Sequence, residues 1–349
     1  MLQKKTNLQL IQLLRGIACL LVAFLHISET YLSTYHTFFL GNIFKFGGAG
    51  VDIFFVLSGF IITYSNSQFL TKSSSIIKFL KKRIIRIFPI YWIIISFLLL
   101  MQVALPFFYR THYQFAGTNL LSTYLLLPNH NMVNGVSWTL TNELFFYIIF
   151  TIALLIPQKK YSIILLFIYL GILLLFPILP LSKNLINNFT DSILFPMNIE
   201  FLLGIIIVLL MDKLPKNWCT PLLITGVALF IFGAILTNSG KQVFTNSYNR
   251  VLLFGLPSFI IILAVVKYEL TTKIYIHNLF IKLGDASYSI YLFHLPLVAA
   301  FFKIIVKFNI TNYTQVLILI AGLLIIICYM GIAIYEKIEI PLIKWLNRA

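Results

Sequence analysis

The feature that most constrains this chain is a series of apolar runs of about 18–22 residues, spread along its 349 residues with little polar sequence between them. A helix of about 20 apolar residues crosses a hydrocarbon layer about 30 Å thick. Only 10% of the residues are charged, whereas an ordinary soluble domain has about 25%. The pattern predicts an integral membrane protein and excludes a water-soluble fold.

Ten segments are predicted to span the membrane as helices, because a helix satisfies its own backbone polar groups in lipid. We therefore expect an all-α, polytopic fold in which residues 1–349 form a single membrane domain without an appended extracytoplasmic domain. The expected spans are residues 9–30, 47–66, 86–105, 136–156, 161–178, 192–211, 220–237, 251–267, 286–306 and 314–335.

The formal net charge of +16 is concentrated in the short segments between these spans. If the N-terminus lies in the cytosol, 19 of the 26 Lys and Arg residues fall on the cytosolic side. Loops rich in Lys and Arg stay in the cytosol, so both termini are predicted to be cytosolic. The excess of basic residues is explained by this orientation, so no nucleic-acid partner is predicted. We expect a multi-pass protein of the bacterial cytoplasmic (inner) membrane with the lipid bilayer as its partner.

Ionisable side chains within the predicted spans are candidates for function, because they are costly in lipid. Arg15 and His26 share one face of the first span and lie about 16 Å apart along it. Arg83 and Arg86 share a face at the start of the third span, where they could bind phosphate as a fork or anchor the topology. Glu143 lies near the predicted outer face in the fourth span.

Other polar positions leave functional and structural interpretations open. Asp52 lies just inside the second span and requires a partner, and Ser58 follows it on the same helix. Tyr291 and His294 share a face of the ninth span with Ser287, where substrate contact and interhelical hydrogen bonding are both plausible. Glu200 could have a structural pairing role. The three cysteines lack metal-ligand spacing, so no metal is predicted.

Five motifs, in order along the chain, resemble those of the acyltransferase-3 family of integral membrane acyltransferases. Together they cover nearly the whole chain, although each alone is weak. They are Arg15 and His26 with ten residues between them, the segment Gly50–Phe60, the Arg-x-x-Arg motif at Arg83 and Arg86, Trp138-Thr139-Leu140 followed by Glu143, and the segment Leu283–His294.

The resemblance implies ten core helices and the transfer of an acyl group, usually acetyl, from cytosolic acyl-CoA to a hydroxyl of a sugar or another acceptor. It implies that His26 is the catalytic histidine with Arg15 as its motif partner, and that Glu143 is an essential acid on the outer side. Arg83 and Arg86 would hold the acyl-CoA donor. Members of the family modify O-antigen, capsule and exopolysaccharide, so a glycan or a lipid-linked glycan is the expected acceptor.

We expect neutral His26 to act as the general base toward the acceptor hydroxyl, because imidazole titrates near physiological pH. An acyl-histidine intermediate remains an alternative. Glu143 is expected to orient His26 or the sugar. The side chains expected to contact substrate are Asp52, Ser58, Trp138, Tyr291 and His294.

Three other functions are compatible with buried His, Arg and Glu residues. A secondary transporter or glycan exporter would use them as a proton or solute relay, but the chain has no clear internal repeat. An acyltransferase could instead modify a small metabolite. A non-catalytic subunit would work alongside other polysaccharide-assembly proteins, which are also expected partners, but the complete set of motif residues argues against lost activity.

Overall fold

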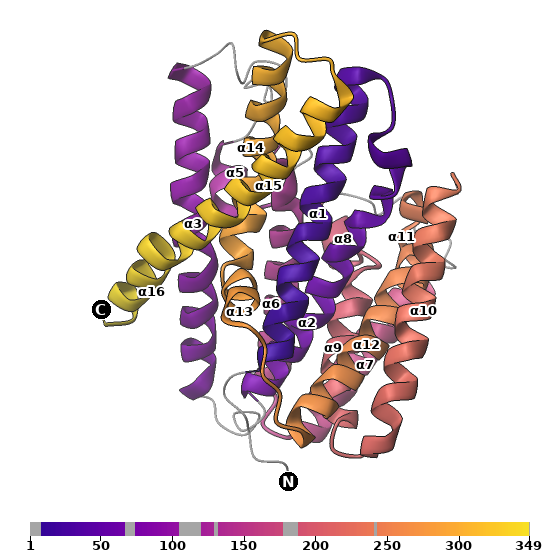
Figure 1. The fold of residues 1–349 in the computed structure, drawn as a ribbon. Coiled ribbons are helices and arrows are strands. Elements are labelled where there is room, and N and C mark those ends of the chain that lie inside the picture. Colours follow the sequence, from indigo (N-terminus) through magenta and orange to yellow (C-terminus); the bar gives the residue numbers. More distant parts are fainter. Residues whose placement is uncertain are drawn as a thin grey trace.

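The computed structural model of the protein describes residues 8–66, 74–104, 120–128, 132–176, 188–240 and 243–348. Within these ranges the regular structure is helical throughout and contains no strand. The long helices stand side by side as a bundle (Figure 1). The predicted all-α, polytopic fold is confirmed.

Ten helices coincide with the ten predicted spans. Nine helical segments of the described residues are long and apolar enough to cross a membrane. The tenth, α7, has 17 residues, which is at the lower limit for a span. The ten are α1 (Gln9–Tyr35), α2 (Ala49–Asn66), α3 (Ser74–Ala104), α6 (Trp138–Leu155), α7 (Lys159–Leu175), α9 (Asn198–Leu210), α10 (Cys219–Asn238), α12 (Leu256–Thr271), α14 (Ser287–Lys307) and α15 (Tyr313–Ile334).

Shorter helical segments connect or extend the spans. The α-helical ones are α5 (Leu120–Leu125), α8 (Asn188–Ile193), α11 (Ser247–Arg250), α13 (Asn278–Asp285) and α16 (Ile340–Arg348). The 3-10 turns are η1 (Phe39–Asn42), η2 (Lys45–Gly48), η3 (Gly135–Ser137), η6 (Lys216–Trp218) and η7 (Val243–Thr245), and the π-helical turns are η8 (Val251–Gly255) and η9 (Tyr335–Glu339).

The helix α3 begins twelve residues earlier than the predicted third span, at Ser74. Its first turns combine Lys and Arg with Ile, Leu and Phe. The apolar side chains and the aliphatic parts of Lys and Arg can pack against the protein, while the charged groups extend to water. Arg83 and Arg86 therefore lie well inside a helix rather than at its entrance.

Close contact between α2 and α9 holds the centre of the bundle. A β-carbon added at Gly59 would lie 2.0 Å from the Phe201 carbonyl oxygen, and one at Gly204 would lie 2.2 Å from the Val56 carbonyl oxygen. Only glycine permits two backbones to approach so closely. This contact fixes the position of Ser58, the neighbour of Gly59.

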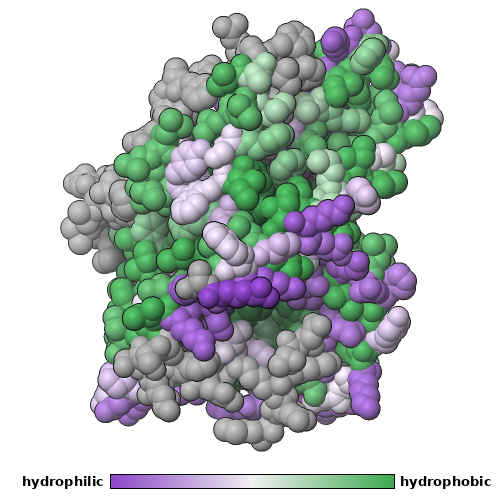
Figure 2. Space-filling view, turned by 90° about the vertical axis from the view of Figure 1, so that its left-hand side faces the viewer, coloured by the Kyte–Doolittle hydropathy of each residue, from purple (hydrophilic) through white to green (hydrophobic). Residues whose placement is uncertain are grey.

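The segment from α15 to α16 runs obliquely across the bundle and ends beside α3 (Figure 1). Pro341 does not interrupt it, because the helix continues through Pro341 directly after the π-helical turn η9. Figure 2 shows the face on which α3 and α16 lie: hydrophobic side chains cover its upper part, and polar side chains form a band across the lower half. α16 has an apolar face and a basic face, as the sequence of an interfacial helix would predict.

Candidate active site

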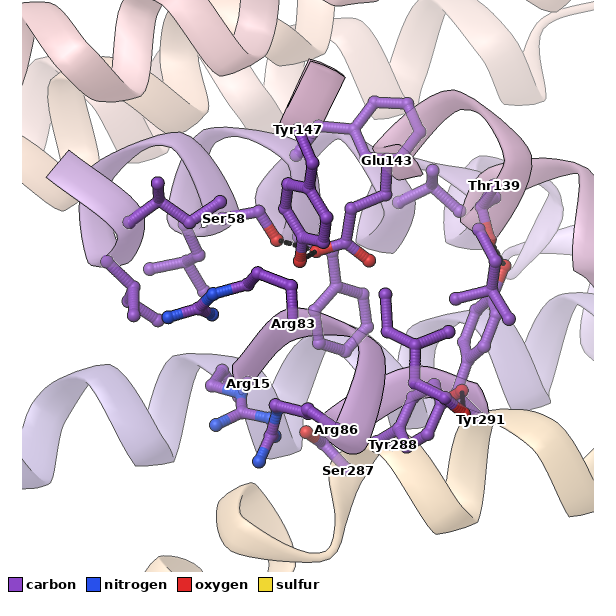
Figure 3. Close-up of a pocket in the computed structure, with 18 residues that line it drawn as sticks. Arg15, Ser58, Arg83, Arg86, Thr139, Glu143, Tyr147, Ser287, Tyr288 and Tyr291 are labelled. Carbon is purple, nitrogen blue, oxygen red and sulfur yellow. Dashed lines mark hydrogen bonds between the residues drawn. The ribbon is translucent and has the colours of Figure 1, made fainter. Parts of the chain in front are cut away.

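A cavity of about 150 Å³ lies among α1, α2, α3, α6 and α14. Arginines gather at one end of it, Glu143 lies in the middle, and Thr139 and Tyr291 lie at the other end (Figure 3). The polar residues that line it are Arg15, Ser58, Arg83, Arg86, Thr139, Glu143, Tyr147, Ser287, Tyr288 and Tyr291.

The basic end of the cavity holds Arg15 from α1 with Arg83 and Arg86 from α3. No carboxylate among the described residues forms an ion pair with these three guanidinium groups. Arg83 lies 5.6 Å from the ring centroid of Phe79 and 5.9 Å from that of Tyr147, and its buried Nε atom has no hydrogen-bond partner within the described ranges. Three buried or half-buried cations with unused donors form a site for an anion.

Two carboxyl groups interact electrostatically with the basic end of the cavity without forming ion pairs with it. Asp285 and Glu339 both interact electrostatically with Arg15. Burial raises the pKa of the Asp285 carboxyl, and the charges of Arg15 and Arg86 oppose that rise. Glu339 accepts a hydrogen bond of 2.6 Å from Ser289 Oγ, and its other carboxyl oxygen has no partner in the part of the chain that the structure describes. Sequence reasoning missed Glu339, because it lies beyond the last predicted span, where a glutamate gives no sign of burial.

Glu143 occupies the middle of the cavity and is held there by two hydroxyl groups. Its Oε1 atom accepts hydrogen bonds from Ser58 Oγ at 2.9 Å and from Tyr147 Oη at 2.5 Å. Figure 3 shows both side chains pointing toward the carboxylate. Glu143 was expected to orient His26 or the sugar, and the hydrogen bonds that it makes among the described residues are those from Ser58 and Tyr147. A carboxylate in a cavity needs donors, and these hydroxyls supply them.

At the far end of the cavity, Tyr291 Oη and Thr139 Oγ1 are 3.0 Å apart and share a hydrogen bond. Pro296 interrupts the backbone hydrogen bonding of α14 just beyond this point. The carbonyl group thus freed, that of Leu292, accepts a hydrogen bond of 3.0 Å from Asn134 Nδ2. Asn134 is therefore the residue that uses the carbonyl freed by Pro296.

His26 does not line the cavity but is linked to it by two contacts. Its ring stacks on that of His294, with centroids 5.3 Å apart and planes inclined by 28°. His294 is fully buried, and its Nδ1 atom lies 2.7 Å from the carbonyl oxygen of Tyr291, which lines the cavity. His26 is therefore connected to the cavity through His294 and Tyr291.

Three residues expected to contact substrate do not line the cavity, namely His294, Asp52 and Trp138. Asp52 is fully buried and is occupied by Arg250, whose Nε lies 3.1 and 3.0 Å from its two oxygens and whose Nη2 lies 2.8 Å from Oδ2. Trp138 packs edge-on against Phe55 and Phe195. The sequence had indicated that Asp52 needed a partner, but it could not identify Arg250, which is 198 residues away.

A family described as an acyltransferase domain matches residues 9–334 of this chain. The chain belongs to the acyltransferase-3 family. This acyltransferase is 25% identical over 321 residues to the exopolysaccharide production protein ExoZ of Rhizobium meliloti (strain 1021), a match that covers 87% of this chain and 92% of ExoZ. It is also 33% identical over 124 residues to nodulation protein 10 of Rhizobium leguminosarum bv. viciae, covering 30% and 32% of the two chains. No solved structure matches it.

Proposed function

We propose that this acyltransferase moves an acyl group, acetyl in the first instance, from cytosolic acyl-CoA to a hydroxyl of a cell-surface or exported glycan. The bacterial cytoplasmic membrane is its proposed location. The similarity to ExoZ supports a polysaccharide acceptor, because that relative is described as an exopolysaccharide production protein and is matched over 92% of its length.

The observation that carries the donor assignment is the set of arginines at one end of the cavity, none of which forms an ion pair with a carboxylate of the described residues. Acyl-CoA presents several phosphate groups, and guanidinium groups bind phosphate with two parallel hydrogen bonds. Arg83 and Arg86 lie on the helix whose first turns carry the Lys-rich segment at 78–82, so this end of the cavity is on the predicted cytosolic side. The pantetheine arm would extend from there past Glu143 toward Tyr291.

The acceptor hydroxyl needs a base, and His26 is the residue proposed for it. In the proposed step the hydroxyl oxygen attacks the thioester carbonyl carbon, a C–O bond forms and the C–S bond breaks. His26 takes the hydroxyl proton and passes it to the departing thiolate of CoA. Tyr291 and Thr139 lie at the end of the cavity nearest His26, where the thioester would be placed.

The donor assignment is tested by steady-state kinetics of the purified protein with acyl-CoA. Arg83→Ala and Arg86→Ala should each raise KM for acyl-CoA by about 10- to 100-fold, because a hydrogen bond to a charged group contributes about 1.5–3 kcal/mol. Lys82→Ala is the matched control, since Lys82 is an exposed cation on the same helix. An unchanged KM in both arginine variants would remove these residues from the donor site.

The acceptor assignment is tested by mass spectrometry of surface glycans from cells with and without the gene. The deletion should remove one acyl group from a defined sugar, and expression of the wild-type protein should restore it. His26→Ala should accumulate normally in the membrane without restoring the acyl group. Glycans that are identical in the two strains would overturn the proposed acceptor class, and restoration by His26→Ala would overturn the proposed base.

A further inference from the structure

Glu29, one turn beyond His26 on α1, makes the one hydrogen bond that the described residues offer to the His26 ring. His26 Nδ1 and Glu29 Oε2 are 2.9 Å apart. An ionised carboxylate can only accept, so the hydrogen between these atoms belongs to Nδ1. The neutral imidazole then carries no hydrogen on Nε2, and that nitrogen presents a lone pair.

One face of the His26 ring is restrained by His294. The Tyr291 carbonyl can only accept a hydrogen bond, so His294 Nδ1 carries its hydrogen and His294 Nε2 is an acceptor. His294 Nε2 is buried and has no partner among the described residues. His294 therefore contributes a neutral ring that fixes the plane of His26 by stacking, while Glu29 fixes its rotation within that plane.

We propose that Glu29 is a positioning residue of the acyl-transfer reaction, which holds His26 with its hydrogen on Nδ1 so that Nε2 receives the proton of the acceptor hydroxyl. The inference rests on the proposed function and deepens it, because it names the basic atom and the group that orients it. A carboxylate beside Nδ1 also stabilises the imidazolium that exists after proton transfer.

The exposure of the two residues indicates the side from which the acceptor arrives. The side chain of Glu29 is 60% exposed and that of His26 is 23% exposed, whereas His294 behind them is fully buried. The donor cavity lies on the buried side, beyond His294 and Tyr291. The acceptor therefore approaches His26 past Glu29, from the open side, so that a bulky glycan can present one hydroxyl without entering the bundle.

The test compares Glu29→Ala, Glu29→Gln and Glu29→Asp with the wild type in the purified transfer assay. Glu29→Ala should lower kcat by about 100-fold, within the range of general-base effects, and leave KM for acyl-CoA unchanged. Glu29→Asp should recover part of the loss because it restores a carboxylate. Glu29→Ala should add nothing to His26→Ala, because Glu29 acts through His26. Glu336→Ala is the matched control, an exposed glutamate bound to Lys282.

The outcomes distinguish a failure of the role of Glu29 from a failure of the proposed function. Wild-type transfer together with an unchanged kcat in Glu29→Ala would overturn the role of Glu29 and leave the proposed function standing. The role is also overturned if all three variants lose activity and thermal stability equally, because this would be a purely structural effect. An absence of transfer by the wild-type protein, with acyl-CoA and the native glycan supplied, would instead overturn the proposed function.

Discussion

Replacing Asp52 with asparagine should destabilise the bundle rather than weaken substrate binding. The substitution keeps the shape of the side chain and removes only its charge. Arg250 then loses the carboxylate toward which three of its hydrogen-bonding contacts are directed, and its fourth contact, to the Gly48 carbonyl oxygen at 2.8 Å, cannot neutralise it. The guanidinium would remain largely buried, with 11% of the side chain exposed.

The magnitude follows from the burial of this ion pair. Removing one partner of a buried pair costs about 3–5 kcal/mol, since the other charge stays desolvated. Asparagine retains one acceptor oxygen, so the loss for Asp52→Asn should be about 3 kcal/mol.

The assay is equilibrium unfolding of the purified protein in mixed detergent micelles, followed by KM for acyl-CoA on the folded fraction. A control is provided by Lys282 and Glu336, which form an ion pair of 2.7 Å with side chains 45% and 44% exposed. Exposed pairs contribute about 0–1 kcal/mol, so Glu336→Gln should unfold nearly as the wild type does. The contrast between the two pairs measures the effect of burial directly.

The reasoning is refuted if Asp52→Asn unfolds with the free energy of the wild type. If the same variant raised KM for the acceptor without losing stability, Asp52 would be a substrate contact, as the sequence had suggested. A loss in Asp52→Asn no larger than in Glu336→Gln would show that water reaches the Asp52–Arg250 pair and that the burial argument is wrong.

Three further predictions concern packing and hydrogen bonding. Gly204→Val should lower the free energy of unfolding by about 1–3 kcal/mol, since its β-carbon would lie 2.2 Å from a backbone oxygen of α2; wild-type stability would contradict it. Asn134→Ala should cost about 1–3 kcal/mol in the same assay by stranding the Leu292 carbonyl, unless water replaces the amide. Tyr147→Phe should lower kcat/KM about tenfold, because Glu143 loses one of two hydroxyl donors; unchanged kinetics would exclude this contact from the reaction.

Much of the fold could be predicted because lipid imposes a simple rule on each segment separately. Ten apolar runs were long enough to span a bilayer, and ten helices occupy them. The boundaries were harder to place where basic and apolar residues alternate. The first twelve residues of α3 are an example. They are helical, but their lysines and arginines lower the hydropathy, so hydropathy alone places the start of the span later.

Part of the candidate site was also predictable from the free-energy cost of placing a charged side chain within a membrane span. Arg15, Arg83, Arg86 and Glu143 stood out because charges are expensive within a span, and all four line one cavity. Glu29 was missed because it lies at the outer end of the predicted span, where a charged side chain can reach water and is not costly. Its spacing of three residues from His26 was the available signal.

The sequence by itself determined that the chain is helical and membrane-spanning, and which side chains were too costly to be incidental, because these follow from the chemistry of each residue and its neighbours in one helix. The tertiary structure alone decided the partners: Asp52 with Arg250, Glu143 with Ser58 and Tyr147, and His26 with His294. Most of these pairs join helices far apart in the chain, and helix rotation and depth, set by packing such as that of α2 on α9, determine which charges meet.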